Sequence, residues 1–135
     1  MENYKLVKDI HILYVNATSF PEGVLKAHQK LHSTLPGIQQ RQCFGLSRPE
    51  NGKIQYMAGA EEMHEREAKE KGLKSMIIQK GNYHSILIRN YNSRIESIGE
   101  AFEKLIQLPD IDPQGYCVEL YSGENDVRCM VRIKD

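Results

Sequence analysis

The sequence predicts an α+β fold made of two β-α-β-β units related by a pseudo-twofold axis, with antiparallel sheets, two main helices and a central cleft. Three observations support this prediction. The stretch Lys30–Ile54 is similar to Lys104–Val127, 74 residues further on. Both copies contain a helix-like segment that closes on Leu-Pro, and both continue into alternating strands joined by a polar turn. Internal repeats fix an architecture more firmly than local propensity does.

The two copies differ at one position on their best-matching strand. Cys43-Phe44-Gly45-Leu46 aligns with Cys117-Val118-Glu119-Leu120, so a glutamate stands where the first copy has a glycine. Two paired copies leave a groove between them, and such grooves are common ligand sites. The difference between the copies therefore indicates where function lies.

The first unit is expected over about residues 10–60. Residues 10–17 are rich in β-branched and aromatic side chains and predict a strand. A helix follows, with Thr18 or Ser19 as its cap and Pro21 and Glu22 in its first turn, and it ends at Leu35-Pro36-Gly37. Residues 42–47 and 54–59 predict a hairpin turned at Asn51-Gly52.

The second unit is expected over about residues 74–133, after a charged surface excursion at 60–71. Strands are predicted at 74–78 and 82–89, and Ser93 with Glu96 has the spacing of a capping box. The helix that follows ends at Leu108-Pro109, and residues 116–121 and 127–133 predict the last hairpin. Residues 1–135 are expected to form one domain.

Composition restricts the functional class. Eighteen basic and eighteen acidic residues balance, which argues against a DNA-binding face. Three cysteines without CxxC spacing argue against a zinc site or a disulfide framework. No stretch resembles a signal peptide or an apolar membrane span, so a cytoplasmic protein with no membrane contact is expected.

Glu119 is the main candidate for chemistry. Along its strand, Val118 and Leu120 point to one face and Glu119 and Tyr121 to the other. We expect the helices to cover the Val118 face, which leaves Glu119 toward the groove or the solvent. A carboxylate among aromatic rings has a raised pKa and favours a cationic partner. The alternative is an exposed Glu119 paired with Arg128 or Arg132.

The tyrosines suit a pocket for amphipathic ligands. The chain has seven tyrosines and no tryptophan, and Tyr56, Tyr83 and Tyr121 fall on predicted strands. Tyrosine combines a flat apolar ring with a hydroxyl group. Because strands are rich in tyrosine in any case, core packing is the alternative for each of them.

Motifs for other chemistry are absent from the sequence. His28 and His32 have the i, i+4 spacing of helical metal ligands, but no third ligand is near, and no metal is expected. There is no G-x-S-x-G, H-E-x-x-H, P-loop or dinucleotide motif. Hydrolysis of a reactive substrate by a carboxylate and a tyrosine stays open.

Taken together, the chain resembles the GyrI-like small-molecule-binding domain, which includes the gyrase inhibitory protein and the effector domains of AraC-type and MerR-type multidrug-sensing regulators. The resemblance runs from about Ile10 to Ile133. It rests on the duplicated unit, the strand end Tyr-Met-Ala-Gly-Ala-Glu (56–61), Gly81-Asn82-Tyr83, and Val-Glu-Leu-Tyr (118–121).

The resemblance implies a cleft lined by aromatic side chains, with a glutamate that meets cationic amphipathic ligands. Glu119 matches that glutamate, and Tyr56 and Tyr83 match positions of cleft aromatics. Tyr121 follows Glu119 on the same strand face. Phe44 is expected to lie at the cleft too, and it is bulky enough to fill it. The first strand begins near residue 10, so no helix-turn-helix precedes it and no direct DNA binding is expected.

The sequence thus predicts a stand-alone binding protein that senses or sequesters xenobiotics, with a possible link to transcription regulation and no cofactor. Two alternatives remain. One is a hydrolase of reactive xenobiotics that uses Glu119 and a cleft tyrosine. The other is an inhibitor of a larger protein partner such as a gyrase-like enzyme, acting through residues 61–71.

Overall fold

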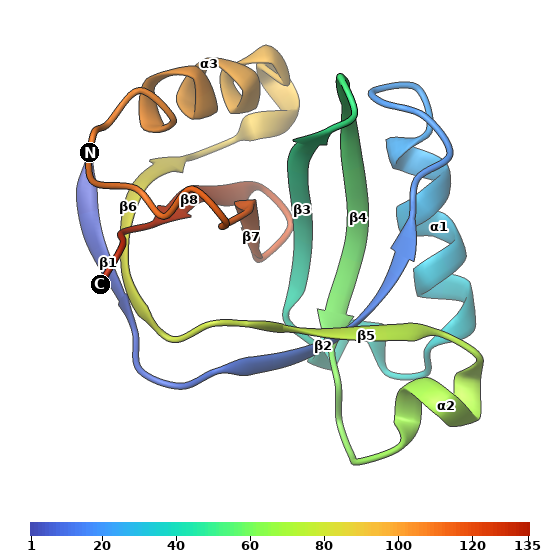
Figure 1. Ribbon diagram of the computed structural model, residues 1–135. Helices are drawn as coiled ribbons and strands as arrows, with labels where there is room; N and C mark the ends of the chain where they lie inside the picture. The colour runs from blue at the N-terminus through green and yellow to red at the C-terminus, as the bar shows by residue number, and fades with distance from the viewer.

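A computed structural model describes residues 1–135, and a single antiparallel sheet of eight strands forms its framework (Figure 1). Helices α1 and α3 lie on the convex side of this sheet, and the sheet curls around its own concave side (Figure 1). The elements are β1 (Glu2–Leu6), β2 (Ile10–Asn16), α1 (Val24–Thr34), β3 (Cys43–Glu50), β4 (Lys53–Glu61), α2 (Glu67–Lys71), β5 (Lys74–Ile78), β6 (Gly81–Ile88), α3 (Glu96–Leu105), β7 (Cys117–Ser122) and β8 (Asp126–Arg132).

The strand order confirms the predicted duplicated α+β fold and adds one strand that was not predicted, β1 in the first unit. The order is β1-β6-β8-β7-β3-β4-β2-β5. If β1 corresponds to β5, β2 to β6, β3 to β7 and β4 to β8, this order reads the same from both ends. Each unit is therefore β-β-α-β-β, and its first strand pairs with the other unit. The sequence pattern did not reveal β1, because this edge strand is short and mostly exposed, and only Tyr4 and Leu6 alternate with its polar residues.

The hairpin between β3 and β4 follows the sequence signal closely. Asn51 and Gly52 both have positive φ, 52° and 77°, and Glu50 pairs with Lys53 across them. Two consecutive residues with positive φ make a type I′ turn, whose twist matches that of the strands it joins. The predicted turn at Asn51-Gly52 is confirmed.

Both predicted helix starts are wrong by several residues. α1 begins at Val24 after a turn over residues 18–23, and no side chain caps it. α3 begins at Glu96, because Ser93 lies in a short 3₁₀ turn where its hydroxyl donates to the Asn90 carbonyl. Neither helix is long and apolar enough to cross a bilayer, and the same holds for α2.

The helices cover the face opposite to the one expected. Val118 and Leu120 face the concave side, where they join a core that the sheet supplies by itself. Cys117 and Tyr121 face α3 on the convex side, and Glu119 shares that face. The expectation failed because the concave core needs no helix. Large side chains from strands across the whole curled sheet fill it, namely Ile12, Phe44, Leu46, Met57, Ile78, Tyr83 and Met130.

Candidate functional site

The candidate site lies where the two units meet. β3 and β7 are neighbours at the centre of the sheet, and Gly45 is directly opposite Glu119 in their register. A Cβ atom on residue 45 would clash with the Tyr56 hydroxyl and with Glu119 Oε1, and would lie 2.9 Å from Glu119 Cδ. The glycine of the first copy therefore provides the space that the glutamate of the second copy occupies.

Glu119 is held by two phenols. Tyr56 from β4 and Tyr121 from β7 both donate their hydroxyl hydrogens to Oε1, at 2.9 and 2.5 Å. His28 on α1 places Nε2 2.8 Å from the Tyr56 hydroxyl oxygen. Tyr56 donates its only hydroxyl hydrogen to Glu119, so its oxygen can only accept a hydrogen bond from His28. The imidazole of His28 must therefore carry a hydrogen on Nε2.

The carboxyl group of Glu119 is buried without a cation. Its residue is 7% exposed, and it forms no ion pair. Burial raises its pKa above the ordinary value, although the hydrogen bonds from Tyr121 and Tyr56 oppose this rise. His28 does not supply the missing charge, because burial and the nearby His32 lower its pKa to about 4.

One oxygen of this carboxyl group is free for a partner. Both phenols use Oε1, and Oε2 takes part in no hydrogen bond within the protein. No fully buried side-chain oxygen or nitrogen lacks a partner, so Oε2 must be reachable from outside. The site thus offers an unpaired carboxyl oxygen to a ligand.

Aromatic rings from both units surround the glutamate. Phe20 stacks on Tyr56 with ring centroids 5.8 Å apart, and it is 43% exposed. Tyr91 meets Tyr121 edge-on at 5.6 Å, and the His28 ring lies 5.8 Å from Tyr121. Sequence reasoning did not assign Phe20, Tyr91 or His28 to the site. The sequence singled out His28 only for its i, i+4 spacing to His32, as a candidate metal ligand.

Two residues proposed for the site lie elsewhere. Tyr83 and Phe44 belong to the concave core, on the other side of the sheet from Glu119. The Tyr83 hydroxyl donates to the Gln79 carbonyl at 2.5 Å. Of the five residues proposed at the cleft, the structure brings together Glu119, Tyr56 and Tyr121.

The alternative of an exposed Glu119 paired with a strand arginine does not hold. Arg128 bonds Glu2 at 3.0 Å and Arg132 bonds Asp135 at 3.2 Å, and both arginines project to the concave side. Glu119 therefore has no cationic partner within the chain.

Nearby groups are unsuited to metal binding or thiol chemistry. His28 and His32 lie with rings 6.1 Å apart, but no set of three metal-ligating side chains comes together anywhere in the structure. Cys117 and Cys129 share the face of Glu119, and burial raises their pKa to about 11 and about 12. Both thiols are protonated at neutral pH and are weak nucleophiles.

Comparison by sequence identifies no relatives: no family model matches the chain, and no curated protein matches it.

Comparison by structure finds proteins of the same fold at low identity. SAV2435 bound to tetraphenylphosphonium superposes with a TM-score of 0.65 at 12% identity, covering 99% of this chain and 94% of that one. A candidate bacterial transcription regulation protein from Staphylococcus aureus MU50 gives 0.63 at 12% identity, covering 99% and 97%. A hydrolase from Listeria innocua gives 0.60 at 11% identity, covering 98% and 90%. These likenesses concern the fold alone.

Proposed function

We propose that this chain is a binding module for small amphipathic cations, of the GyrI-like type, in which Glu119 holds the positive charge. The observation that carries the proposal is a buried carboxyl group with one unpaired oxygen and no cation of the protein near it. Keeping a carboxylate ionised in such a place costs several kcal/mol unless a cation accompanies it. A bound cation would supply that partner.

The surroundings of Glu119 favour a ligand with aromatic or other apolar groups around its charge. Rings of Tyr56, Tyr121 and His28 border the carboxyl group, and aromatic faces attract cations as well as apolar surface. The fold relative with bound tetraphenylphosphonium, a cation surrounded by four aromatic rings, is consistent with this ligand class.

Entry to the site requires side chains to move. Tyr56 is only 2% exposed, and Phe20 lies over its ring. Phe20 belongs to a turn between β2 and α1 that is mostly exposed. We propose that Phe20 and the start of α1 move aside as the ligand approaches Glu119.

The test is calorimetric titration with tetraphenylphosphonium, with triphenylphosphine oxide as an uncharged control of similar shape. Glu119→Gln keeps the size and the acceptor oxygen but removes the charge, and it should weaken the cation at least about 10-fold. Glu124→Gln, which changes an exposed carboxylate in the β7–β8 turn, should bind as the wild type does. Equal affinity of Glu119→Gln and wild type would refute the assignment.

A hydrolytic role is the second candidate, and one contact favours it. A carboxyl group bonded to two phenols can act as a base toward water while a phenol hydrogen stabilises a developing anion. A fold relative is a hydrolase. Turnover of an electrophilic amphiphile that is lost in Glu119→Gln and in Tyr56→Phe would favour this role over plain binding.

A further inference from the structure

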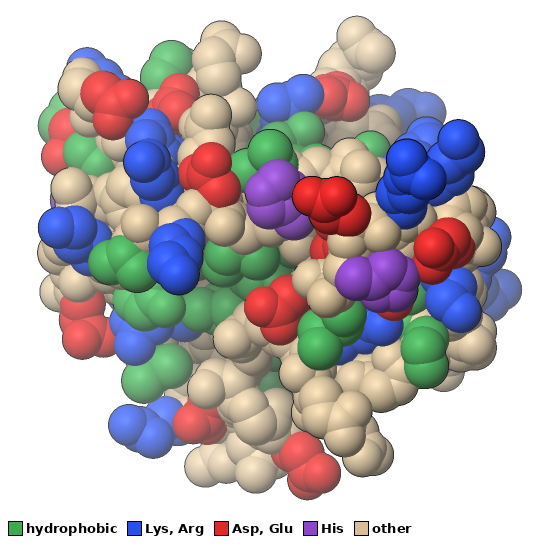
Figure 2. Space-filling view, turned by 90° about the horizontal axis from the view of Figure 1, so that it is seen from below, with side chains coloured by type: hydrophobic (Ala, Val, Ile, Leu, Met, Phe, Trp, Pro, Cys, Tyr) green, Lys and Arg blue, Asp and Glu red, His purple; other side chains and the backbone are tan.

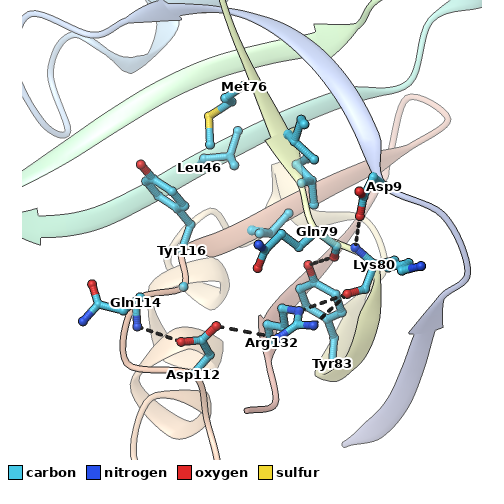
Figure 3. Close-up of a pocket in the computed structure, with 14 residues that line it drawn as sticks. Asp9, Leu46, Met76, Gln79, Lys80, Tyr83, Asp112, Gln114, Tyr116 and Arg132 are labelled. Carbon is cyan, nitrogen blue, oxygen red and sulfur yellow. Dashed lines mark hydrogen bonds and ion pairs between the residues drawn. The ribbon is translucent and has the colours of Figure 1, made fainter. Parts of the chain in front are cut away.

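A cavity lies on the concave side of the sheet, behind the strand that carries Glu119. Its volume is about 550 Å³, within the range of small-molecule sites. From below, hydrophobic side chains are visible in a hollow bordered by basic and acidic ones (Figure 2). The walls come from strands at both ends of the sheet and from the segment before β7 (Figure 3). The apolar and aromatic lining is Leu46, Met76, Ile78, Tyr83, Tyr116 and Val118.

This cavity arises from a second difference between the two units. Val118 in the second unit corresponds to Phe44 in the first, one position before the Gly45 and Glu119 pair. Phe44 is fully buried and fills its place in the concave core. The smaller Val118 leaves space at the equivalent place, and the cavity lies against it.

We propose that this cavity binds an uncharged, largely apolar molecule with one amide-like polar group. This site is separate from the Glu119 site and does not depend on the function proposed above. The preference for an uncharged molecule follows from the charged groups at its mouth, and the preference for an amide follows from Gln79.

Arg132, the arginine at the mouth, is already occupied by carboxylates and by the backbone. Arg132 donates from Nε and Nη2 to the Lys80 carbonyl at 3.0 and 2.9 Å, and it pairs with Asp135 at 3.2 Å and with Asp112 at 3.7 Å. Asp9 accepts from the Lys80 amide at 2.8 Å. The Lys80 side chain extends away from the cavity (Figure 3). A charged ligand that reaches Arg132 and Asp112 would lose hydration there without finding a free partner, since these two groups already pair with each other.

Gln79 and Tyr116 supply the remaining recognition. The Gln79 carboxamide points into the cavity and makes no hydrogen bond within the protein, so it offers one donor and one acceptor side by side (Figure 3). An amide group of a ligand complements both. The Tyr116 ring forms a flat wall, and the Arg48 guanidinium holds it at 4.4 Å from the ring centroid.

The test uses Nile red, an uncharged dye that brightens in apolar sites, in a fluorescence titration. Wild type should bind one dye molecule saturably, and Val118→Phe should weaken it at least about 10-fold, because a filled site excludes the dye. The fold already holds phenylalanine at the equivalent position, Phe44. Glu124→Gln is the control, since it changes an exposed carboxylate in the β7–β8 turn that does not line the cavity, and it should bind the dye unchanged.

Competition identifies the ligand class. N-phenylbenzamide should displace the dye, whereas decanoate and dodecyltrimethylammonium should do so at least about 10-fold less well. If Val118→Phe does not fold, Met76→Trp is used in its place. Met76 is half-buried and lines the same cavity, so a larger side chain there narrows it. The proposal is overturned if wild type shows no saturable dye binding, if the folded filling variant binds as well as wild type, or if a charged competitor is the strongest.

Discussion

Glu119 is surrounded by groups that are neutral at physiological pH. Tyr56 on β4, Tyr121 on β7 and Tyr91 before α3 all have pKa values raised by burial, and His28 on α1 has a pKa lowered to about 4. The cysteine opposite it on β8 is also protonated. With no charge to stabilise it, the ionised carboxylate is disfavoured, and the raised pKa of Glu119 follows.

This environment makes cation binding depend on pH. In the free protein the pKa of Glu119 lies above its usual 4.5, and a bound cation must lower it again. The complex therefore holds fewer protons than the free protein, and affinity should rise with pH, by up to about 10-fold per pH unit below the raised pKa. Tetraphenylphosphonium is suited to the measurement because it does not titrate.

Calorimetry in two buffers of different ionisation enthalpy would count the protons released. We expect the wild type to release protons when it binds the cation. Any residual binding by Glu119→Gln should release none. A cation affinity that stays constant from pH 5 to 8 would contradict the coupling between cation binding and deprotonation of Glu119. It would not contradict cation binding at this site.

At this scale the sequence predicted the glutamate but not its whole surroundings. Glu119 and Tyr121 follow from strand alternation and from the repeat, because both lie on one strand. Tyr83 and Phe44 were assigned to the same cleft, yet they face the other side. Alternation tells which residues share a face, but it does not tell which face the helices cover, and here the concave side has a core of its own.

At the scale of elements, a buried ion pair connects α2 to the rest of the fold. Arg41 and Glu67 are 8% and 1% exposed and join through two hydrogen bonds of 2.7 and 2.5 Å. Arg41 also donates to the carbonyls of Pro36 and Glu61, and Glu67 accepts from the Met63 amide. The pair thus ties the segment after α1, the end of β4 and α2 together.

Breaking this pair should be costly. Glu67→Gln leaves a buried guanidinium without its counter-charge, and a loss of about 3–5 kcal/mol in unfolding free energy is expected from urea denaturation. Glu70→Gln, on the same helix with its carboxylate exposed, is the matched control. A loss below about 1 kcal/mol in Glu67→Gln would show that α2 is not held in this way.

The same pair predicts an acid limit to stability. The hydrogen bonds from Arg41 lower the pKa of Glu67 from 4.5 to about 2. A lowered pKa stabilises the fold above the usual value, and this stabilisation is lost as the pH falls from about 4.5 toward 2. This ion pair could not be predicted from the sequence, because residues 60–71 carry many charged side chains and nothing distinguishes Glu67 from the others.

At the scale of the whole molecule, the exchange of β1 and β5 makes the two units equivalent in topology. If the first unit followed the second in the sequence, the main elements would come in the order β5-β6-α3-β7-β8-β1-β2-α1-β3-β4. The internal twofold maps this order of elements onto the original one. The termini permit the change, since β1 and β8 flank the same strand, β6, and the chain ends lie on one side of the molecule (Figure 1).

A circular permutant that opens at Gly72 should therefore fold. Gly72 is exposed at the end of α2 and has a positive φ of 69°. With a flexible linker of about eight residues joining the old termini, the melting temperature should fall by no more than about 8 °C. Opening the chain at Ala58, inside β4, is the control and should prevent folding. Failure of the Gly72 permutant alone would mean that the units do not substitute for each other.

The Gly45 and Glu119 pair has a consequence for how such a site can arise. The two residues face each other across the internal twofold, so two identical chains assembled in this way would place the same residue on both sides of the axis. They would bring together either two glycines, with no charge, or two carboxyl groups in space that holds one. A single carboxylate on the axis requires the two halves to mutate independently, and a duplication within one chain allows that. In this molecule, broken symmetry is the condition for having a charged site at all.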